Sequence, residues 1–278
     1  HGLSEHRLGN LLHQKTRHEF ILSTKVGRVY RPFKGDPVLF DGSPWVGGLP
    51  FEWNFDYSAA GFERSFLDST MRLGLNRIDL LVIHDLDRSY HGKSVSNKLQ
   101  ELETGMEWLK MMKNSAAIQA FGAGINDIEM IPLFLEHFEL DFFLVAMPYT
   151  LLNQELLKDI FPECERRGIG VIIGSPYASG ILASGSRKES KYGYAAVSEE
   201  MLKKVQSIEV ICEDHGIPLK AAALQFPLAH PQVSSVIPGS LRAAQVNENL
   251  EMLKIHIPLE FWLELKQTGL LHPEAPVA

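Results

Sequence analysis

The sequence predicts an α/β fold, a (β/α) barrel whose parallel strands alternate with helices. Short β-rich runs alternate with segments of helical periodicity along all 278 residues, which is typical of a parallel sheet with helical crossovers. The strand-length runs are apolar throughout, as expected when helices cover one face and a packed barrel interior the other. Because barrels of roughly 250 residues are common, we expect a single domain over residues 1–278.

In the first half of the chain, apolar residues recur at helix or strand spacing between recognisable end signals. Phe62, Phe66 and Leu73 share one helix face, and Gly74 ends that helix. Asn97 is a suitable N-cap for the next long helix. The pattern predicts, besides that helix, strands over 20–24, 78–83 and 118–122 and helices over 3–12, 57–73 and 127–138.

The alternation continues in the second half. Ser198 caps a predicted helix that Gly216 ends, and Pro218 opens the next one. The other predicted elements are strands over 142–146, 170–173 and 234–237 and a helix over 153–167 ended by Gly168. Six strands are thus predicted. Two long segments, 32–56 and 176–197, are predicted as loops, and loops of this length are usually binding loops or lids.

Composition excludes several classes of partner. The formal net charge of −7 gives no broad positive field for nucleic acid or an anionic membrane surface. The two cysteines, Cys164 and Cys212, are not spaced for a thiolate metal site and favour a reducing, cytoplasmic location. The apolar runs are shorter than the ~20 residues that span a bilayer. We therefore expect a cytoplasmic protein with a small-molecule substrate and no membrane or nucleic-acid partner.

Polar residues follow the predicted strands at their carboxyl ends. Lys25 and His84 each end an apolar run, and Asn126, Ser175 and Gly239 stand at the corresponding places of later strands. Barrel enzymes place their chemistry at this rim. A strand-end lysine is also often solvated and a histidine often belongs to the core, so position alone leaves both interpretations open.

Several motifs, in order and at the right spacing, resemble those of the aldo-keto reductases. Residues 22–26 (LSTKV) and 79–84 (DLLVIH) resemble the catalytic lysine and histidine segments, and residues 2–9 resemble the helix after the catalytic tyrosine. Residues 120–126 resemble the fifth strand, and residues 174–182 and 236–249 resemble the pyrophosphate and adenosine segments. The resemblance implies an NAD(P)-dependent oxidoreductase on an eight-stranded barrel, in which Lys25 lowers a tyrosine pKa and His84 orients the substrate oxygen.

The same resemblance implies a dinucleotide site. Its candidate residues are Asn126, Ser175, Pro176, Tyr177, Ser179, Gly180, Ile237, Gly239, Ser240, Arg242, Gln245 and Asn249. A strand that leads through residues 238–240 into a helix suits a phosphate, because free N–H groups and the helix dipole meet there. Relatives that prefer NADP carry basic residues in place of Gly239 and Gln245, so we expect NAD. Arg242 remains near enough to keep NADP as the second candidate.

Two departures from the wider family indicate a branch. Ala146 replaces a glutamine that holds the carboxamide in many relatives, and Gly174 replaces a stacking tyrosine. With residues 149–152 and 180–183, they resemble the branch of aldose 1-dehydrogenases and pyridoxal 4-dehydrogenase. This implies oxidation of a cyclic hemiacetal, an aldose or pyridoxal, to a lactone. The alternatives are a catalytically weak nicotinamide-binding regulatory protein, a general carbonyl reductase and a metal-dependent hydrolase.

The 32–56 segment carries aromatic candidates for a substrate platform. Trp45, Phe51 and Trp53 are suited to stacking on a sugar or pyridine ring, and they are equally suited to anchoring the loop by packing. The acidic and histidine residues at 85, 87 and 91 lack a recognised ligand spacing, so we expect no metal. The charged run 186–191 is predicted to be solvated surface.

The resemblance also implies residues that would precede His1. The catalytic tyrosine and aspartate of the family belong to its second strand and following loop, and two strands and one helix of a complete barrel are not found in the sequence. We therefore expect a barrel that begins partway, and a chain that binds better than it catalyses.

Overall fold

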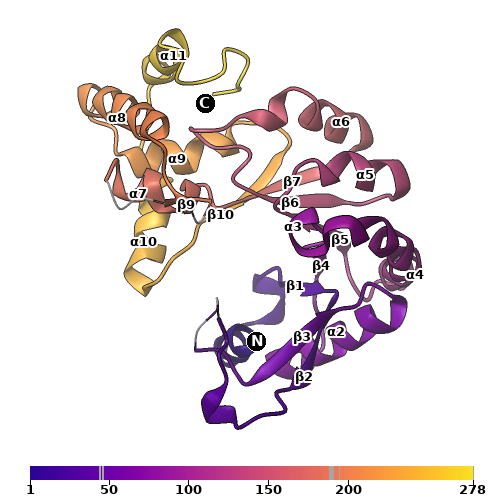
Figure 1. The fold of residues 1–278 in the computed structure, drawn as a ribbon. Coiled ribbons are helices and arrows are strands. Elements are labelled where there is room, and N and C mark those ends of the chain that lie inside the picture. The colour runs from indigo at the N-terminus through magenta and orange to yellow at the C-terminus, as the bar shows by residue number, and fades with distance from the viewer. Residues whose placement is uncertain (44, 46, 188–190, 194, 278) are drawn as a thin grey trace. The chain divides into compact units, whose positions relative to one another are not determined.

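The computed structural model describes residues 1–43, 45, 47–187, 191–193 and 195–277. The chain consists of two compact units, His1–Phe142 and Phe143–Ala278, which are followed by colour in Figure 1. Each unit is described by itself. The expectation of a single domain stays a prediction.

Unit 1 contains three parallel strands in the order β1 (Ser23–Val26), β4 (Leu80–His84) and β5 (Ala120–Ile125). Lys25 pairs with Val82, and His84 pairs with Gly124. Each predicted strand therefore exists, but each begins two or three residues later than expected. The α-helices of the unit are α1 (Leu3–Leu12), α2 (Ala59–Leu73), α3 (Arg88–His91), α4 (Val95–Asn114) and α5 (Met130–His137).

The buried Asp79 contacts the residues that precede the strands of unit 1. Its Oδ2 accepts the backbone N–H of Leu22 at 2.7 Å and a guanidinium N–H of Arg17 at 2.6 Å. Its Oδ1 accepts from the Gln119 amide at 3.2 Å. The residues just before three strands thus converge on one carboxylate, whose side chain is 2 % exposed. The Leu22 N–H bonds to this side chain and is therefore not available to the strand ladder at the start of β1.

Helix α2 illustrates how the sequence sets an element. The Ser58 hydroxyl accepts the N–H of Gly61 at the start, and Gly74 ends the helix in the left-handed region at φ 63°. Phe62 and Leu73 are buried on its inner face, as predicted. In Figure 1, α2 and α4 lie side by side.

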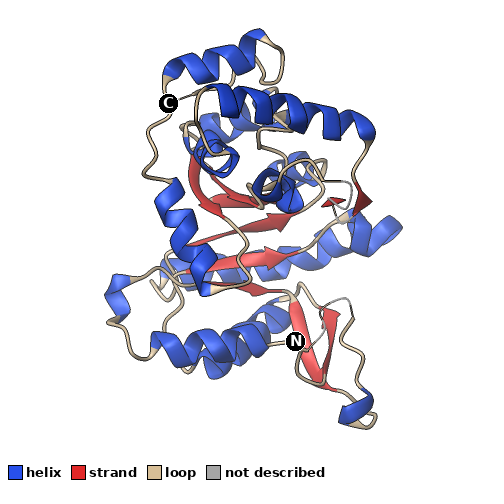
Figure 2. Ribbon diagram, turned by 90° about the vertical axis from the view of Figure 1, so that its left-hand side faces the viewer, coloured by secondary structure: helices blue, strands red, loops and turns tan. Residues whose placement is uncertain are grey.

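The segment between β1 and α2 is not the structureless loop that was predicted. It begins and ends in an antiparallel pair, β2 (Arg28–Pro32) and β3 (Phe51–Phe55), in which Arg28 lies opposite Phe55. This pair stands apart from the parallel strands in Figure 2. Residues 51–55 (FEWNF) alternate polar and apolar side chains as a strand does, but the strand with which they pair lies some twenty residues earlier in the chain.

Unit 2 carries the other three parallel strands in the order β6 (Phe142–Ala146), β7 (Gly170–Gly174) and β10 (Val233–Ile237). Gly174 pairs with Ile237, so two candidate cofactor segments leave the sheet side by side. The α-helices are α6 (Ile160–Arg167), α7 (Ile181–Ser184), α8 (Glu199–Asp214), α9 (Leu219–Leu228), α10 (Ala243–Met252) and α11 (Leu259–Gln267). The predicted caps Ser198 and Gly168 are confirmed.

Three local predictions in unit 2 need correction. The predicted helix over 153–167 is α-helical only from Ile160, because the Asn153 side chain accepts the N–H of Glu155 and starts a 3-10 turn at Glu155–Leu157 instead. Pro218 precedes α9 rather than being its first residue. The predicted loop over 176–197 contains α7 and the short pair β8 (Lys191–Tyr192) and β9 (Ala195–Ala196), and residues 188–190 lie outside the described residues.

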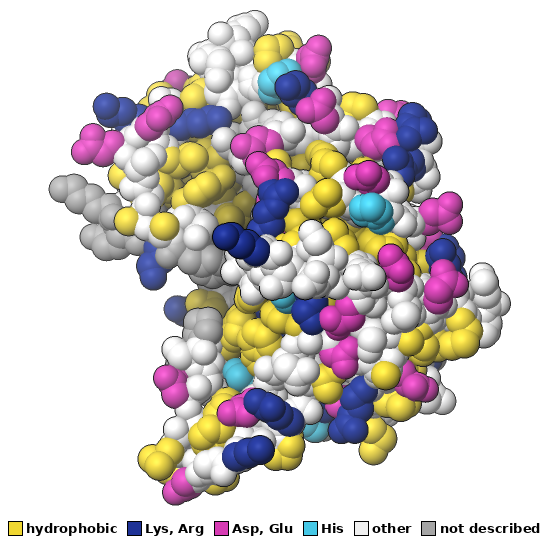
Figure 3. All heavy atoms as spheres, turned by 45° about the vertical axis from the view of Figure 1, so that its right-hand side comes forward, with side chains coloured by type: hydrophobic (Ala, Val, Ile, Leu, Met, Phe, Trp, Pro, Cys, Tyr) yellow, Lys and Arg dark blue, Asp and Glu magenta, His cyan; other side chains and the backbone are white. Residues whose placement is uncertain are grey.

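The surface agrees with the net charge. Basic and acidic side chains are interspersed over the face shown in Figure 3. Within the described ranges, every helix is too short or too polar to cross a membrane.

Candidate active site

Lys25 and His84 stand at the carboxyl ends of adjacent parallel strands. The register pairs Val26 with Ile83, so His84 lies one residue further along its strand. Lys25 keeps contact with solvent and forms no ion pair within the described residues. The protein around it lowers the pKa of its ammonium by desolvation, which Asp85 opposes and Arg28 reinforces.

His84 is neutral in this environment. Its side chain is 18 % exposed, and burial lowers its pKa to about 2, with further lowering from the positive charges of Lys25 and Arg28. Its Nε2 atom lies 3.3 Å from Oδ2 of Asp85. A neutral imidazole offers one N–H donor, and that is what orienting a substrate oxygen requires.

Arg28 is part of this site and was not predicted from the sequence. It is the first residue of β2 and only 7 % exposed, and its Nη2 donates to Asp85 Oδ2 at 2.6 Å. Four aromatic rings surround the guanidinium. Its carbon lies 4.3 Å from the ring centre of Trp53, 5.1 Å from that of Phe55, 5.2 Å from Tyr90 and 5.3 Å from Trp45, all within the ~6 Å range of cation–π attraction.

This cage accounts for two of the three aromatic residues expected to contact substrate. Trp45 and Trp53 lie edge to face, with ring centres 6.5 Å apart, against Arg28. Phe51 is placed elsewhere, where its carbonyl accepts from the His1 ring at 2.6 Å. The tryptophans therefore pack in the structure, as the alternative interpretation held. Stacking on substrate stays a prediction for all three.

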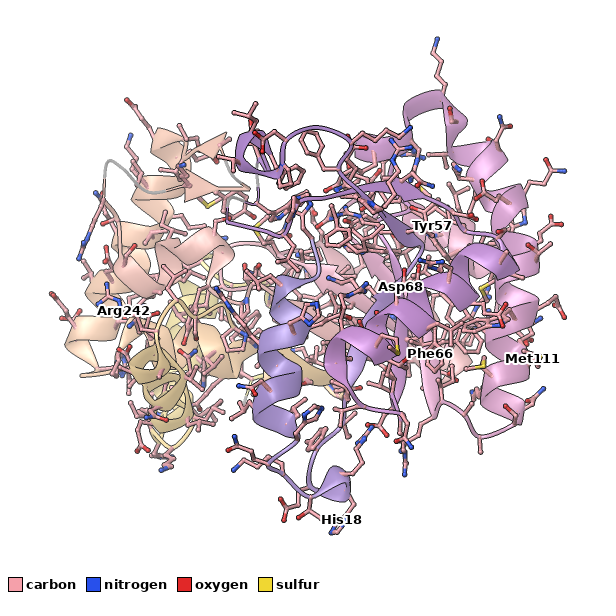
Figure 4. All side chains as sticks on the ribbon, turned by 90° about the horizontal axis from the view of Figure 1, so that it is seen from below. His18, Tyr57, Phe66, Asp68, Met111 and Arg242 are labelled. Carbon is pink, nitrogen blue, oxygen red and sulfur yellow. The ribbon has the colours of Figure 1, made fainter. Side chains whose placement is uncertain are left out.

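The Tyr57 side chain packs against the turn that follows β4 and bonds to it. The phenol is fully buried, and its hydroxyl donates to the carbonyls of His84 at 2.9 Å and Asp85 at 3.1 Å. The His91 Nε2 lies 2.9 Å from the same hydroxyl, so the ring N–H donates to the Tyr57 oxygen. Burial raises the pKa of this phenol far above its ordinary value. Figure 4 shows Tyr57 within unit 1. Its hydroxyl holds the turn after β4 by hydrogen bonds and does not exchange protons.

Asn126 follows β5 and ties the acidic turn together. Its amide nitrogen donates to Asp85 Oδ1 at 3.2 Å and to Asp87 Oδ2 at 3.0 Å. Both amide protons are thus used, which leaves the side-chain oxygen as an acceptor for a ligand N–H. The predicted role at the cofactor is compatible with this orientation.

The acidic turn has no arrangement typical of a metal site. Asp85 bonds to Arg28, Asp87 accepts from the backbone N–H groups of Asn126 and Asp127, and His91 bonds to Tyr57. In the part of the chain that the structure describes, no group of three or more metal-binding side chains is found.

In unit 2 the chain turns sharply after β7 through residues in the left-handed region. Ser175 has φ 55°, Ala178 48°, Ser179 60° and Gly180 98°, and the buried Pro176 and Tyr177 separate the first two. Three of these residues donate their N–H groups within the protein, Ser175 to Ile237, Ala178 to Ser175 and Gly180 to Tyr177, and these bonds fix the turn. A Cβ atom at Gly180 would meet open space, so the strain, and not crowding, favours glycine there.

The second cofactor segment lies against the first. Ser175 donates its N–H to the Ile237 carbonyl at 3.3 Å. The Tyr177 hydroxyl donates to Asn249 Oδ1 at 2.7 Å, and Asn249 Nδ2 donates to Ser240 Oγ at 3.2 Å. The segments predicted to bind pyrophosphate and adenosine are therefore brought together through the buried Asn249.

The start of α10 is capped by its own sequence. Gln245 Oε1 accepts the N–H groups of Leu241 at 2.7 Å and Arg242 at 3.1 Å. Arg242 is exposed, as Figure 4 shows at the surface of unit 2. Gly239 is also exposed, and a Cβ there would contact nothing within 4 Å. The approach to this helix start is open.

Comparison with known proteins identifies the family. The model of the aldo/keto reductase family matches residues 1–269. The chain belongs to the aldo/keto reductase family. It is therefore an NAD(P)-dependent oxidoreductase, and the resemblance inferred from the motifs is confirmed.

Two relatives of this aldo-keto reductase are similar over nearly all of its length. Pyridoxal 4-dehydrogenase of Microbacterium luteolum is 36 % identical over 280 residues, which cover 98 % of this chain and 82 % of the relative. D-threo-aldose 1-dehydrogenase of a Pseudomonas species is 34 % identical over 275 residues, covering 97 % and 81 %. The solved glycerol dehydrogenase of Gluconobacter oxydans matches with a TM-score of 0.71 at 19 % identity, covering 100 % of this chain and 79 % of that one. This last likeness confirms the barrel fold.

Within unit 1, the Asn126 amide oxygen accepts no hydrogen bond among the described residues. Within unit 2, the left-handed turn and the exposed start of α10 lie beside one another through the contacts of Asn249. Sequence reasoning missed Arg28 and Asp85. The available signal was an arginine directly after Gly27, in a segment rich in aromatic residues.

Proposed function

We propose that this aldo-keto reductase oxidises a cyclic hemiacetal, an aldose or pyridoxal, to the corresponding lactone, with NAD as the oxidant. The observation that carries the proposal is the position of Lys25 and His84 at the ends of neighbouring strands. The chain is also 36 % identical to a pyridoxal dehydrogenase and 34 % identical to an aldose dehydrogenase. A general carbonyl reductase would need the same two residues, so the substrate class rests on the relatives.

The oxidation removes a hydride from the anomeric carbon and a proton from its hydroxyl, and the C–O bond of that hydroxyl becomes the lactone carbonyl. Nicotinamide supplies the hydride acceptor when bound. In this scheme His84 donates its single N–H to the reacting oxygen and fixes its direction. Lys25, a cation with no ion-pair partner among the described residues, lowers the pKa of the tyrosine that the family resemblance assigns to proton exchange.

The dinucleotide is proposed to bind through the residues predicted for it. Asn126 accepts from the carboxamide, the turn at residues 175–180 meets the pyrophosphate, and residues 237–249 meet the adenosine. The choice of NAD rests on Gly239, which has no side chain, and Gln245, whose side-chain oxygen is already used in capping α10. A 2′-phosphate would find only Arg242.

The experiment is NADH formation by the full-length protein with L-fucose, L-galactose, D-arabinose and pyridoxal, run in parallel with NADP and with a chelator. We expect turnover with at least one of the four, a preference for NAD, and no effect of chelation. Dinucleotide binding without turnover would favour the regulatory alternative. Reduction of simple aldehydes with none of the four oxidised would favour the general reductase.

The cofactor preference has a separate test in Arg242→Ala. If Arg242 is the remaining contact of a 2′-phosphate, the KM for NADP rises about tenfold while that for NAD changes little, because one charge-assisted contact is lost. An equal change for both cofactors would contradict this assignment.

A further inference from the structure

Asp85 lies between the charged guanidinium of Arg28 and the neutral imidazole of His84. Its Oδ2 atom lies 2.6 Å from Nη2 of Arg28 and 3.3 Å from Nε2 of His84, while Oδ1 accepts from Asn126 at 3.2 Å. A single carboxylate oxygen thus touches both the caged cation and the imidazole. The first contact has the length of a strong charge-assisted bond, and the second is longer than an ordinary one.

The backbone of Asp85 is hydrogen-bonded as well as its side chain. The residue lies in the left-handed region at φ 49°, its carbonyl accepts from Tyr57, and its N–H donates to Gly124 at 3.3 Å. Few non-glycine residues adopt this conformation, although Asp is among those that tolerate it. The turn therefore fixes where the carboxylate stands relative to the preceding His84.

This placement selects one form of the imidazole. A carboxylate oxygen at 3.3 Å attracts an N–H and repels an imidazole lone pair. Because His84 is neutral, the nitrogen beside Asp85 is the one that carries the proton. The proton is then on Nε2 and the lone pair on Nδ1. No hydrogen bond joins the two groups within the described residues, so the N–H stays available to a substrate oxygen.

Arg28 limits how strongly Asp85 acts on His84. A guanidinium does not deprotonate in proteins, and the four rings around it hold it in place. Its short bond to Oδ2 neutralises much of the carboxylate charge. Without it, a free carboxylate beside His84 would favour a doubly protonated imidazolium, which lacks the lone pair and carries a charge.

We propose that Asp85 is a positioning residue that keeps His84 in its Nε2-protonated tautomer, and that Arg28 restrains Asp85 so that the imidazole stays neutral. The consequence for turnover rests on the proposed function, because it requires that the His84 N–H meets the substrate oxygen. The tautomer itself does not depend on any substrate. The competing interpretation is that the Arg28–Asp85 pair only ties the hairpin to the turn.

The test is nitrogen-15 NMR of full-length protein labelled at histidine, with the His84 signals assigned by their loss in His84→Gln. We expect the Nε2-protonated pattern in the wild type. Asp85→Gly removes the carboxylate and suits the positive φ, and Asp85→Asn keeps the shape without the charge and also tolerates it. Each should shift the tautomer ratio about fivefold or more toward Nδ1–H, the change expected when the attraction of the nearby carboxylate for the Nε2 proton is lost.

Arg28→Met fills the aromatic cage without a charge and tests the second half of the proposal. The charged groups that face His84 are Lys25, Arg28, the His1 amino group and Asp85. Losing Arg28 removes one repulsive cation and frees the carboxylate, so His84 takes up its second proton at a higher pH than in the wild type. An unchanged titration would overturn the role of Arg28.

Asp87→Asn is the matched control. It removes a carboxylate from the same turn that also bonds to Asn126 but has no contact with His84, so the tautomer should not change. A wild-type ratio in both Asp85 variants, or an equal shift in Asp87→Asn, would overturn the proposal. If the tautomer shifts as expected and the wild type oxidises no hemiacetal, the proposed function fails and the positioning role stands.

Discussion

Removal of the Tyr57 hydroxyl tests how much its hydrogen bonds to the turn after β4 contribute to the free energy of unfolding. Tyr57→Phe deletes one oxygen that donates to the His84 and Asp85 carbonyls and accepts from His91. A buried hydrogen bond contributes about 1 kcal/mol, and a buried partner left unsatisfied costs roughly 1–3 kcal/mol more. The loss should therefore be about 2–4 kcal/mol, which lowers the Tm by roughly 4–16 °C in a chain of this size.

Thermal unfolding followed by circular dichroism measures this loss, and Tyr30→Phe is its control. Tyr30 is half-buried in β2 beneath the guanidinium of Arg72, and within the described residues its hydroxyl forms no hydrogen bond. The same atom is removed there with a change of under about 0.5 kcal/mol expected. If Tyr57→Phe is no less stable than Tyr30→Phe, the hydroxyl does not support the turn.

Three further perturbations have defined outcomes. Asp79→Asn should cost about 3 kcal/mol in chemical unfolding, because the buried carboxylate loses charge-assisted partners, whereas Asp68→Asn on the surface of α2 should cost under about 0.5 kcal/mol. Lys25→Met should lower turnover about a hundredfold and leave the dinucleotide Kd, measured by fluorescence, within about threefold. Burial lowers the pKa of His230 from 6.5 to about 4. The unfolded chain therefore binds more protons between these values, and stability falls as the pH falls from 6.5 to 4, by up to about 3 kcal/mol. His230→Asn should flatten that slope.

The order of elements could be predicted because its signals are local. Helix end signals such as Gly74 and Ser198 act within a few residues, and the strands are marked by their own apolar runs. The β2–β3 pair was missed because its partners are separated by some twenty residues of loop. A strand in such a segment is stabilised by pairing that no single window of sequence contains.

The residues of the candidate site also differ in how well the sequence predicts them. Lys25 and His84 could be found because each ends an apolar run, and strand ends converge at one rim in a parallel sheet. Arg28 carried only the general signal of an aromatic-rich segment, because its burial also depends on residues as distant as Tyr90. Asn249 was predicted as a ligand contact, and the structure adds that it joins the Tyr177 and Ser240 segments.

One feature of the backbone recurs in both units. The first residue after β4, β6 and β7 is Asp85, Met147 and Ser175, and all three are non-glycine residues with φ between 49° and 71°. Glycine would adopt this conformation without the cost of roughly 1 kcal/mol or more that a side chain brings. The side chains must therefore contribute something that glycine cannot.

For two of these positions the structure shows what that is. Asp85 binds the caged Arg28, and the Met147 sulfur accepts the Ser179 hydroxyl at 3.4 Å within the turn after β7. Strained residues that also hold neighbouring groups are characteristic of sites built for function rather than for stability. A sequence pattern does not reveal a positive φ at Asp, Met or Ser, so the backbone turns at the rim of the sheet could not be predicted, whereas the polar residues at that rim could.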